Sequence, residues 1–249
     1  MIFYFSGTGN SLDAALRMQG DEEVINITDC IWGKNFSFTL KEDEKVGFVF
    51  PVYFGGVPSI VQTFMSKVKF NRIPVYLYAL ITCGGDAFGA GNMAANTLEK
   101  NGLMLDAVWT VEMPDNYIFM YEPDTEEEQA VTLEQAGPVL EEIRKHIENK
   151  DCNDTKGSLK ARMITGVMYP FYVHGRKTKK FYTDDKCVGC ATCVNRCPAK
   201  AMVMENGRPK WIKERCIHCM SCIRCGAVQY GKKTVGRHRY KNPVLKKCH

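Results

Sequence analysis

The chain of 249 residues is 45% hydrophobic and 24% charged, an ordinary composition for a folded protein that excludes collagen-like and disordered classes. No apolar run approaches the roughly 18 residues of a spanning helix, and residues 1–20 lack the basic start of a secretory signal, so we expect a cytoplasmic protein. The net charge of +5 hides an imbalance: residues 1–155 carry 11 Lys and Arg against 24 Asp and Glu, whereas residues 156–249 carry 22 against 4. This contrast predicts two structural units.

The amino-terminal half alternates short apolar runs with helical patterns. Residues 2–5 predict a strand, which is followed by a glycine-rich turn and a helix. Further strands are predicted at 24–27, 46–52, 74–82 and 103–111, and further helices at 59–68, 91–100 and 126–148. These strands are mostly apolar rather than alternating, as strands buried on both faces of a parallel sheet require. The sequence therefore predicts an α/β fold with a five-stranded, doubly wound parallel sheet.

The second half begins with a polar stretch at 150–158, which we interpret as a linker. A helical pattern over 159–173 follows, and we expect it to end near Pro170 because proline disfavours a helix interior. The predicted boundaries are 1–150 for the first domain, 151–180 for linker and connecting helix, 181–231 for a cysteine-rich domain and 232–249 for a basic tail.

Eight of the twelve cysteines fall within 39 residues, in two runs that repeat after about 29 residues. The eight are Cys187, Cys190, Cys193, Cys197, Cys216, Cys219, Cys222 and Cys225. In a reducing cytoplasm, clustered thiolates are better explained as ligands of a soft metal than as disulfides. Zinc, the main alternative to an iron–sulfur cluster, takes four ligands, so eight cysteines oversupply a zinc site. Cys30, Cys83, Cys152 and Cys248 have no ligand spacing and are interpreted as incidental.

The first run, C-x2-C-x2-C-x3-C-P, resembles that of bacterial ferredoxins with two [4Fe–4S] clusters. The resemblance implies a small α+β ferredoxin-like domain in which Cys197 completes the second cluster and Cys225 the first. The second run departs from the pattern, because its last interval is two residues and Gly226 replaces the proline. This departure leaves open a three-iron cluster or a labile iron at the Cys225 corner. His218, between two ligands, is interpreted as a bystander.

The segment after the first strand has neither the GxGxxG nor the Walker pattern. Its small hydroxyl residues and glycines, at the start of a helix, are suited to binding an anion. At the start of a five-strand, doubly wound pattern, this loop resembles that of flavodoxins, which implies that Ser6, Thr8, Gly9, Asn10 and Ser11 hold the phosphate of FMN. The resemblance places the flavin ring at the ends of two later strands, against Pro51, Val52, Tyr53, Phe54, Gly55, Thr82, Cys83, Gly84 and Gly85.

Tyr53 or Phe54 is expected to stack on the flavin ring. Plain core packing of these two side chains is one alternative, and a flavodoxin-like fold that has lost its flavin is another.

A flavodoxin-like unit followed by a two-cluster ferredoxin unit is the arrangement of the EFR1 family of ferrodoxins, found chiefly in anaerobes, and the chain is similar to that family. The resemblance implies an electron-transfer protein that relays electrons between two [4Fe–4S] clusters and FMN. The alternative is an FMN-dependent oxidoreductase that reduces a small molecule, with Asp86 or Tyr117 as acid–base groups. The basic half favours an acidic redox carrier, such as a ferredoxin or flavodoxin, over nucleic acid as the partner, and no membrane contact is expected.

Overall fold

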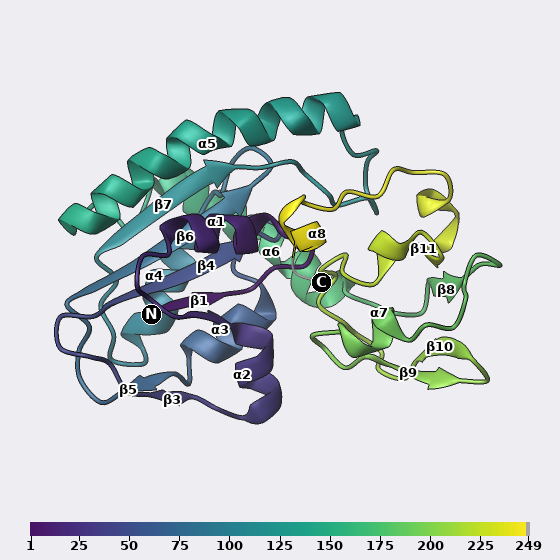
Figure 1. Ribbon diagram of the computed structural model, residues 1–249, viewed down its shortest axis with the longest axis horizontal. Helices are drawn as coiled ribbons and strands as arrows, with labels where there is room; N and C mark the ends of the chain where they lie inside the picture. The colour runs from purple at the N-terminus through teal and green to yellow at the C-terminus, as the bar shows by residue number, and fades with distance from the viewer. Residues whose placement is uncertain (248–249) are drawn as a thin grey trace.

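The computed structural model describes residues 1–247, and the flavodoxin-like and cysteine-rich halves lie side by side (Figure 1). The first half is built on a parallel sheet in the order β2-β1-β4-β6-β7. Its strands are β1 (Ile2–Tyr4), β2 (Val24–Asn26), β4 (Lys45–Pro51), β6 (Tyr76–Cys83) and β7 (Ala107–Glu112). Counted along the chain, these five strands have the order 2-1-3-4-5 of flavodoxin. The predicted doubly wound sheet is confirmed.

Helices cover both faces of this sheet (Figure 1). They are α1 (Asn10–Met18) and α5 (Glu126–Asn149) on one face, and α2 (Ile27–Gly33), α3 (Ser59–Met65) and α4 (Ala90–Glu99) on the other. The sequence did not predict α2, nor the short parallel pair β3 (Ser37–Phe38) and β5 (Lys69–Phe70). Elements of one or two turns, or of two residues, carry too little periodicity to be recognised.

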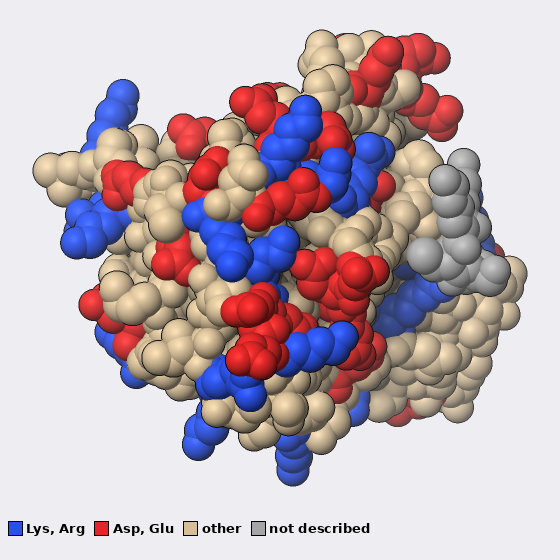
Figure 2. All heavy atoms as spheres, turned by 60° about the vertical axis from the view of Figure 1, so that its left-hand side comes forward, with Lys and Arg blue, Asp and Glu red and all other residues tan. Residues whose placement is uncertain are grey.

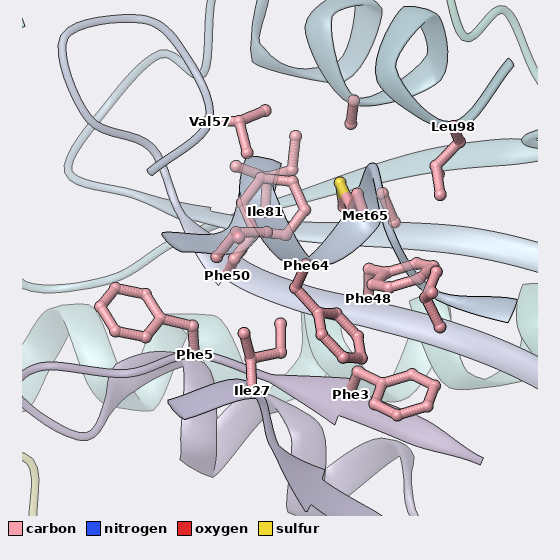
Figure 3. Packing of buried hydrophobic residues seen from close by; sticks show 14 of the residues in the cluster. Phe3, Phe5, Ile27, Phe48, Phe50, Val57, Phe64, Met65, Ile81 and Leu98 are labelled. Carbon is pink, nitrogen blue, oxygen red and sulfur yellow. The ribbon is translucent and has the colours of Figure 1, made fainter. Parts of the chain in front are cut away.

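The sheet buries an apolar layer on each face. Beneath α2 and α3, the ring of Phe3 lies 5.6 Å from that of Phe48 and 5.0 Å from that of Phe64, measured between centroids (Figure 3). All eight residues of β6 are buried, because this strand is covered on both sides. The core thus fixes the strand ends that form one edge of the sheet.

The connecting helix α6 (Leu159–Gly175) continues past Pro170, so the predicted end near this proline is wrong. The neighbouring tyrosines explain why the helix persists. The hydroxyl of Tyr169 donates to the carbonyl oxygen of Val57 at 2.7 Å, and that of Tyr172 accepts from the backbone N–H of Ser59 at 3.2 Å. These bonds to the flavodoxin-like half hold the last turns of α6 despite the hydrogen bond that proline removes.

The cysteine-rich half is a small α+β unit, as predicted, and it contains two antiparallel strand pairs. Its elements are β8 (Phe181–Thr183) paired with β11 (Val228–Tyr230), β9 (Met202–Glu205) paired with β10 (Arg208–Trp211), α7 (Thr192–Asn195), η1 (Ile223–Cys225) and η2 (Gly231–Thr234). The basic tail then returns to the start of α1, where it forms α8 (Val244–Lys247) (Figure 1). Cys248 lies outside the described residues. No helix within residues 1–247 combines the length and apolar character needed to cross a bilayer.

Candidate functional site

A cavity of about 360 Å³ opens at the carboxyl ends of β1, β4 and β6, the edge where open α/β sheets bind their ligands. Its volume falls within the range of small-molecule sites. Thirteen of the fourteen residues predicted to bind the flavin line it: Ser6, Thr8, Asn10, Ser11, Pro51, Val52, Tyr53, Phe54, Gly55, Thr82, Cys83, Gly84 and Gly85. The structure does not bring Gly9 into this lining. A Cβ atom on Gly9 would lie 2.7 Å from the Cβ atom of Asn242 in the tail.

The loop between β1 and α1 is braced by its own hydroxyl groups. Ser6 Oγ accepts from the backbone N–H of Gly9 at 3.0 Å, and Ser11 Oγ lies 2.8 Å from Thr82 Oγ1. Among the described residues no side chain caps α1, so the first N–H groups of this helix stay available at the positive end of its dipole. The loop is therefore suited to holding a phosphate through backbone N–H groups.

Aromatic rings form another wall of the cavity. The ring of Phe54 is stacked with that of Tyr172 at 6.2 Å and meets that of Tyr117 edge-on at 5.3 Å. The ring of Tyr53 also meets Tyr172, edge-on at 5.6 Å. Burial raises the pKa of the Tyr53 and Tyr117 hydroxyls well above the ordinary value, so both phenols stay neutral. An apolar wall of this kind suits a flat aromatic ligand.

Three further segments complete the cavity, and of their residues the sequence analysis named only Tyr117, as an acid–base candidate. They are the loop after β7 (Met113, Pro114, Asp115, Asn116, Tyr117, Met120 and Tyr121), part of α6 (Met168 and Tyr172) and two residues of the cysteine-rich half (His218 and Cys219). The loop after β7 could have been found, because β7 ends at the same edge of the sheet as β4 and β6. No sequence signal indicates that α6 or His218 reaches this site.

The two candidate acid–base residues both line the cavity. The carboxylate of Asp86 accepts from the backbone N–H of Phe88 at 2.6 Å, an interaction within its own turn. The hydroxyl of Tyr117 lies 3.4 Å from Nδ1 of His218.

The structure places four of the eight cysteines around a second cavity: Cys197, Cys216, Cys219 and Cys222. Burial and the neighbouring thiols raise the pKa of Cys222 well above its ordinary value and that of Cys219 to about 12. The fourth cysteine of the first run thus lies with three cysteines of the second, as the resemblance to ferredoxins implies.

Cys225 lies with the other group. Burial raises the pKa of Cys193 to about 11, and the nearby thiols of Cys225 and Cys187 raise it as well. Gly226, directly after Cys225, has a φ of +83°, a left-handed conformation that glycine adopts readily. The chain can therefore turn directly after Cys225.

The second cavity has the chemistry of a cluster site. The indole Nε1 of Trp211 in its wall is buried and has no hydrogen-bond partner among the described residues. A cluster sulfide or thiolate is an acceptor that would satisfy this donor. Nowhere in residues 1–247 do three or more His, Cys, Asp or Glu side chains form a group suited to a single metal ion, but each cysteine of a cubane cluster binds a different iron. The four thiols and the unpaired donor therefore fit a [4Fe–4S] cluster.

The two cavities share part of their walls. Cys219 and His218 line both of them. The interpretation of His218 as a bystander rather than a cluster ligand stays a prediction. A side chain on Gly7 would overlap the carbonyl oxygen of Cys219, so glycine is needed where the two loops meet. Burial lowers the pKa of His218 to about 4, so its imidazole is neutral at pH 7.

Residues 179–225 match the 4Fe-4S dicluster domain family. This part of the chain is therefore an iron–sulfur domain of the electron-transfer class and binds a [4Fe–4S] cluster. No curated protein matches the chain.

Two solved structures are similar in outline. The azoreductase AzrA is 14% identical, with 58% of this chain and 97% of that chain covered and a TM-score of 0.33. The Trp repressor binding protein from Bacillus subtilis is 15% identical, with 56% and 95% covered and a TM-score of 0.32. The strand order, rather than either likeness, defines the fold of the first half as flavodoxin-like.

Proposed function

We propose that the protein relays electrons between two [4Fe–4S] clusters and FMN and so links one-electron carriers to a flavin. The observation that carries the proposal is the shared wall: Cys219 lines both the cavity of four cysteines and the cavity predicted for FMN. A [4Fe–4S] cluster carries single electrons and a flavin can take one or two, so the pair connects both kinds of chemistry.

In this proposal each cluster takes three cysteines from one run and the fourth from the other. The first is held by Cys187, Cys190, Cys193 and Cys225, and the second by Cys197, Cys216, Cys219 and Cys222. The second cluster is the nearer to the flavin, since Cys219 lines both cavities. Cys190 and Cys225 of the first group are exposed, which makes the first cluster accessible to an external carrier.

The flavin would be held by the residues that already line its cavity. The N–H groups at the start of α1 and the hydroxyls of Ser6 and Thr8 would bind the phosphate, and Tyr53 and Phe54 would contact the ring. Thr8 Oγ1 accepts from Asn116 Nδ2 at 2.9 Å, which leaves the Thr8 hydroxyl hydrogen free to donate to phosphate.

The visible spectrum of anaerobically purified protein, with iron, sulfide and flavin counted, tests the proposal. We expect about eight iron and one FMN per chain. Absence of FMN would overturn the flavin site, and four iron would overturn the presence of two clusters. Cys197→Ser and Cys225→Ser should each impair a different cluster, distinguishable by paramagnetic resonance of the reduced protein. Cys152→Ser alters an exposed thiol outside both groups and should keep the full iron content.

The partner we propose is an acidic redox carrier protein that docks on the basic half. Residues 156–249 carry 22 Lys and Arg against 4 Asp and Glu, and such an excess steers acidic partners at low salt. By contrast, basic and acidic side chains are interspersed on the end of the flavodoxin-like half (Figure 2). The rate of reduction by an acidic ferredoxin should fall as ionic strength rises, and a rate insensitive to salt would contradict this assignment. We place the relay in the cytoplasm, where its thiols stay reduced until clusters are assembled.

One observation favours a second candidate, reduction of a small molecule over FMN. The hydroxyl of Tyr121 donates to the carboxylate of Asp115 within the flavin cavity, and such a pair is suited to proton transfer. If the protein is this enzyme, Tyr121→Phe should lower turnover of a small-molecule acceptor without changing the rate of electron exchange with protein carriers.

A further inference from the structure

Residues 237–245, here termed the C-terminal strap, run from the cysteine-rich half along two walls of the flavin cavity. The first part of the strap holds the loop after β7. Nη1 of Arg237 donates to the carbonyl oxygens of Ile118 at 2.6 Å and Tyr121 at 2.9 Å. The backbone N–H of His238 donates to Oε1 of Glu122 at 2.8 Å. Tyr121 itself lines the cavity, so this part of the strap fixes one wall.

The second part of the strap holds the loop between β1 and α1. The hydroxyl of Tyr240 donates to Oδ1 of Asn10, and Nδ2 of Asn242 donates to the same oxygen at 3.2 Å. The backbone N–H of Asn242 donates to the carbonyl oxygen of Thr8 at 2.9 Å. Tyr240 and Asn242 are only 5% and 2% exposed, so these bonds are shielded from water.

Asn10 is the point at which three segments meet. Its Nδ2 donates to the carbonyl oxygen of Pro114 at 3.0 Å, while its Oδ1 accepts the two bonds from the strap. An amide oxygen has two lone pairs, so both are used. The side chain of Asn10 therefore joins the loop, the strap and the segment after β7.

We propose that Tyr240 and Asn242 are positioning residues that hold the loop at residues 6–11 in the form that binds phosphate, and so make the site prefer FMN to riboflavin. Neither residue lines the cavity, so both act through Asn10 and Thr8. A loop fixed in advance loses less conformational freedom when its anion binds, which increases affinity for the phosphate-bearing ligand. This inference rests on the proposed FMN site and adds the residues that make this site prefer FMN to riboflavin.

The strap also connects flavin binding to the cysteine-rich half. Nη2 of Arg239 donates to Oε1 of Gln229 at 2.7 Å and to the carbonyl oxygen of Thr234 at 2.8 Å. Gln229 belongs to β11 and Thr234 to η2. The loop that binds phosphate is thus tied to the half that carries the cysteines.

The test uses the full chain, loaded with clusters and freed of flavin, and measures the Kd of FMN and of riboflavin by quenching of flavin fluorescence. Tyr240→Phe removes one hydroxyl donor, and Asn242→Ala removes one amide donor and also the acceptor of the backbone N–H of Val244. Each variant should bind FMN about five- to tenfold more weakly, as expected for one buried hydrogen bond, and should bind riboflavin as the unaltered protein does. Tyr182→Phe, at a tyrosine of β8 that is 41% exposed, is the matched control and should leave both affinities unchanged.

Iron content and melting temperature are measured for each variant to verify that it is folded. Unaltered FMN affinity in both strap variants would overturn the proposed role of the strap and would leave the proposed FMN site standing. Equal losses of FMN and riboflavin would overturn the assignment to the phosphate loop. Failure of the unaltered protein to bind FMN would overturn the proposed function together with this inference.

Discussion

The two halves of the molecule are stabilised by different means. The flavodoxin-like half has an extended apolar layer on each face of its sheet. The cysteine-rich half has only two small groups of buried apolar side chains, which pack against thiols. Burial of apolar surface supplies about 25 cal/mol per Å², which is enough for a sheet covered on both sides. Small domains with little core depend on metal binding for their folding energy. From this comparison we expect the first half to fold by itself and the second to depend on its bound iron–sulfur centre.

The largest expected effect is that of removing the iron with a chelator under mild oxidation. The cysteine-rich half should then lose its structure while the sheet persists, because cluster binding supplies the folding energy of the former only. Amide hydrogen exchange should show lost protection in residues 181–231 and retained protection in β4 and β6. Protection retained throughout 181–231 would contradict the expected dependence of the cysteine-rich half on its iron.

A core substitution in the flavodoxin-like half should destabilise the sheet rather than the cysteine-rich half. Phe48 is 0% exposed, so Phe48→Ala should lower the free energy of unfolding by about 3–5 kcal/mol, measured by urea unfolding. Phe171, on α6, is 68% exposed, and Phe171→Ala should change it by less than about 0.5 kcal/mol. A similar loss in both variants would contradict the view that the buried layer holds this half.

The contact between the halves is tested at Gly7. A Cβ atom there would overlap the carbonyl oxygen of Cys219, so Gly7→Ala should cost about 1–3 kcal/mol of stability, as overpacking does. The melting temperature of the cluster-loaded protein measures this loss. An unchanged melting temperature would show that the two loops separate at little cost.

The smallest effect is expected at Gly166, inside α6, where a Cβ atom would meet nothing within 4 Å. Gly166→Ala should raise the free energy of unfolding by about 0.5–1 kcal/mol, because alanine loses less backbone freedom than glycine on forming a helix. Denaturant unfolding measures the gain, and a loss of stability would contradict the open space beside this residue.

The elements best predicted from the sequence are those with a strong local pattern. The uninterrupted apolar run of β6 marked a buried parallel strand, and the long pattern of α5 was assigned correctly through Pro138. The same reasoning failed at Pro170, because the bonds that hold α6 there come from Tyr169 and Tyr172 to residues over a hundred positions away. Local propensity does not encode such long-range contacts.

The candidate site shows the same limit. Strand ends and turn residues located most of the cavity predicted for FMN, because in a parallel sheet they must meet at one edge. The packing of Gly9 against the strap, and the bonds of the Asn10 side chain to the strap, could not be predicted. Both depend on Tyr240 and Asn242, which are more than two hundred residues distant in sequence.

The contact between residues 8–10 and 240–242 also has a consequence for the order of events during synthesis. The amino terminus of a nascent chain leaves the ribosome first. The loop between β1 and α1 and the sheet around it therefore emerge long before the strap does. For most of translation this loop lacks the bonds from Tyr240 and Asn242. The rim of the cavity is therefore completed only after the whole cysteine-rich half has emerged.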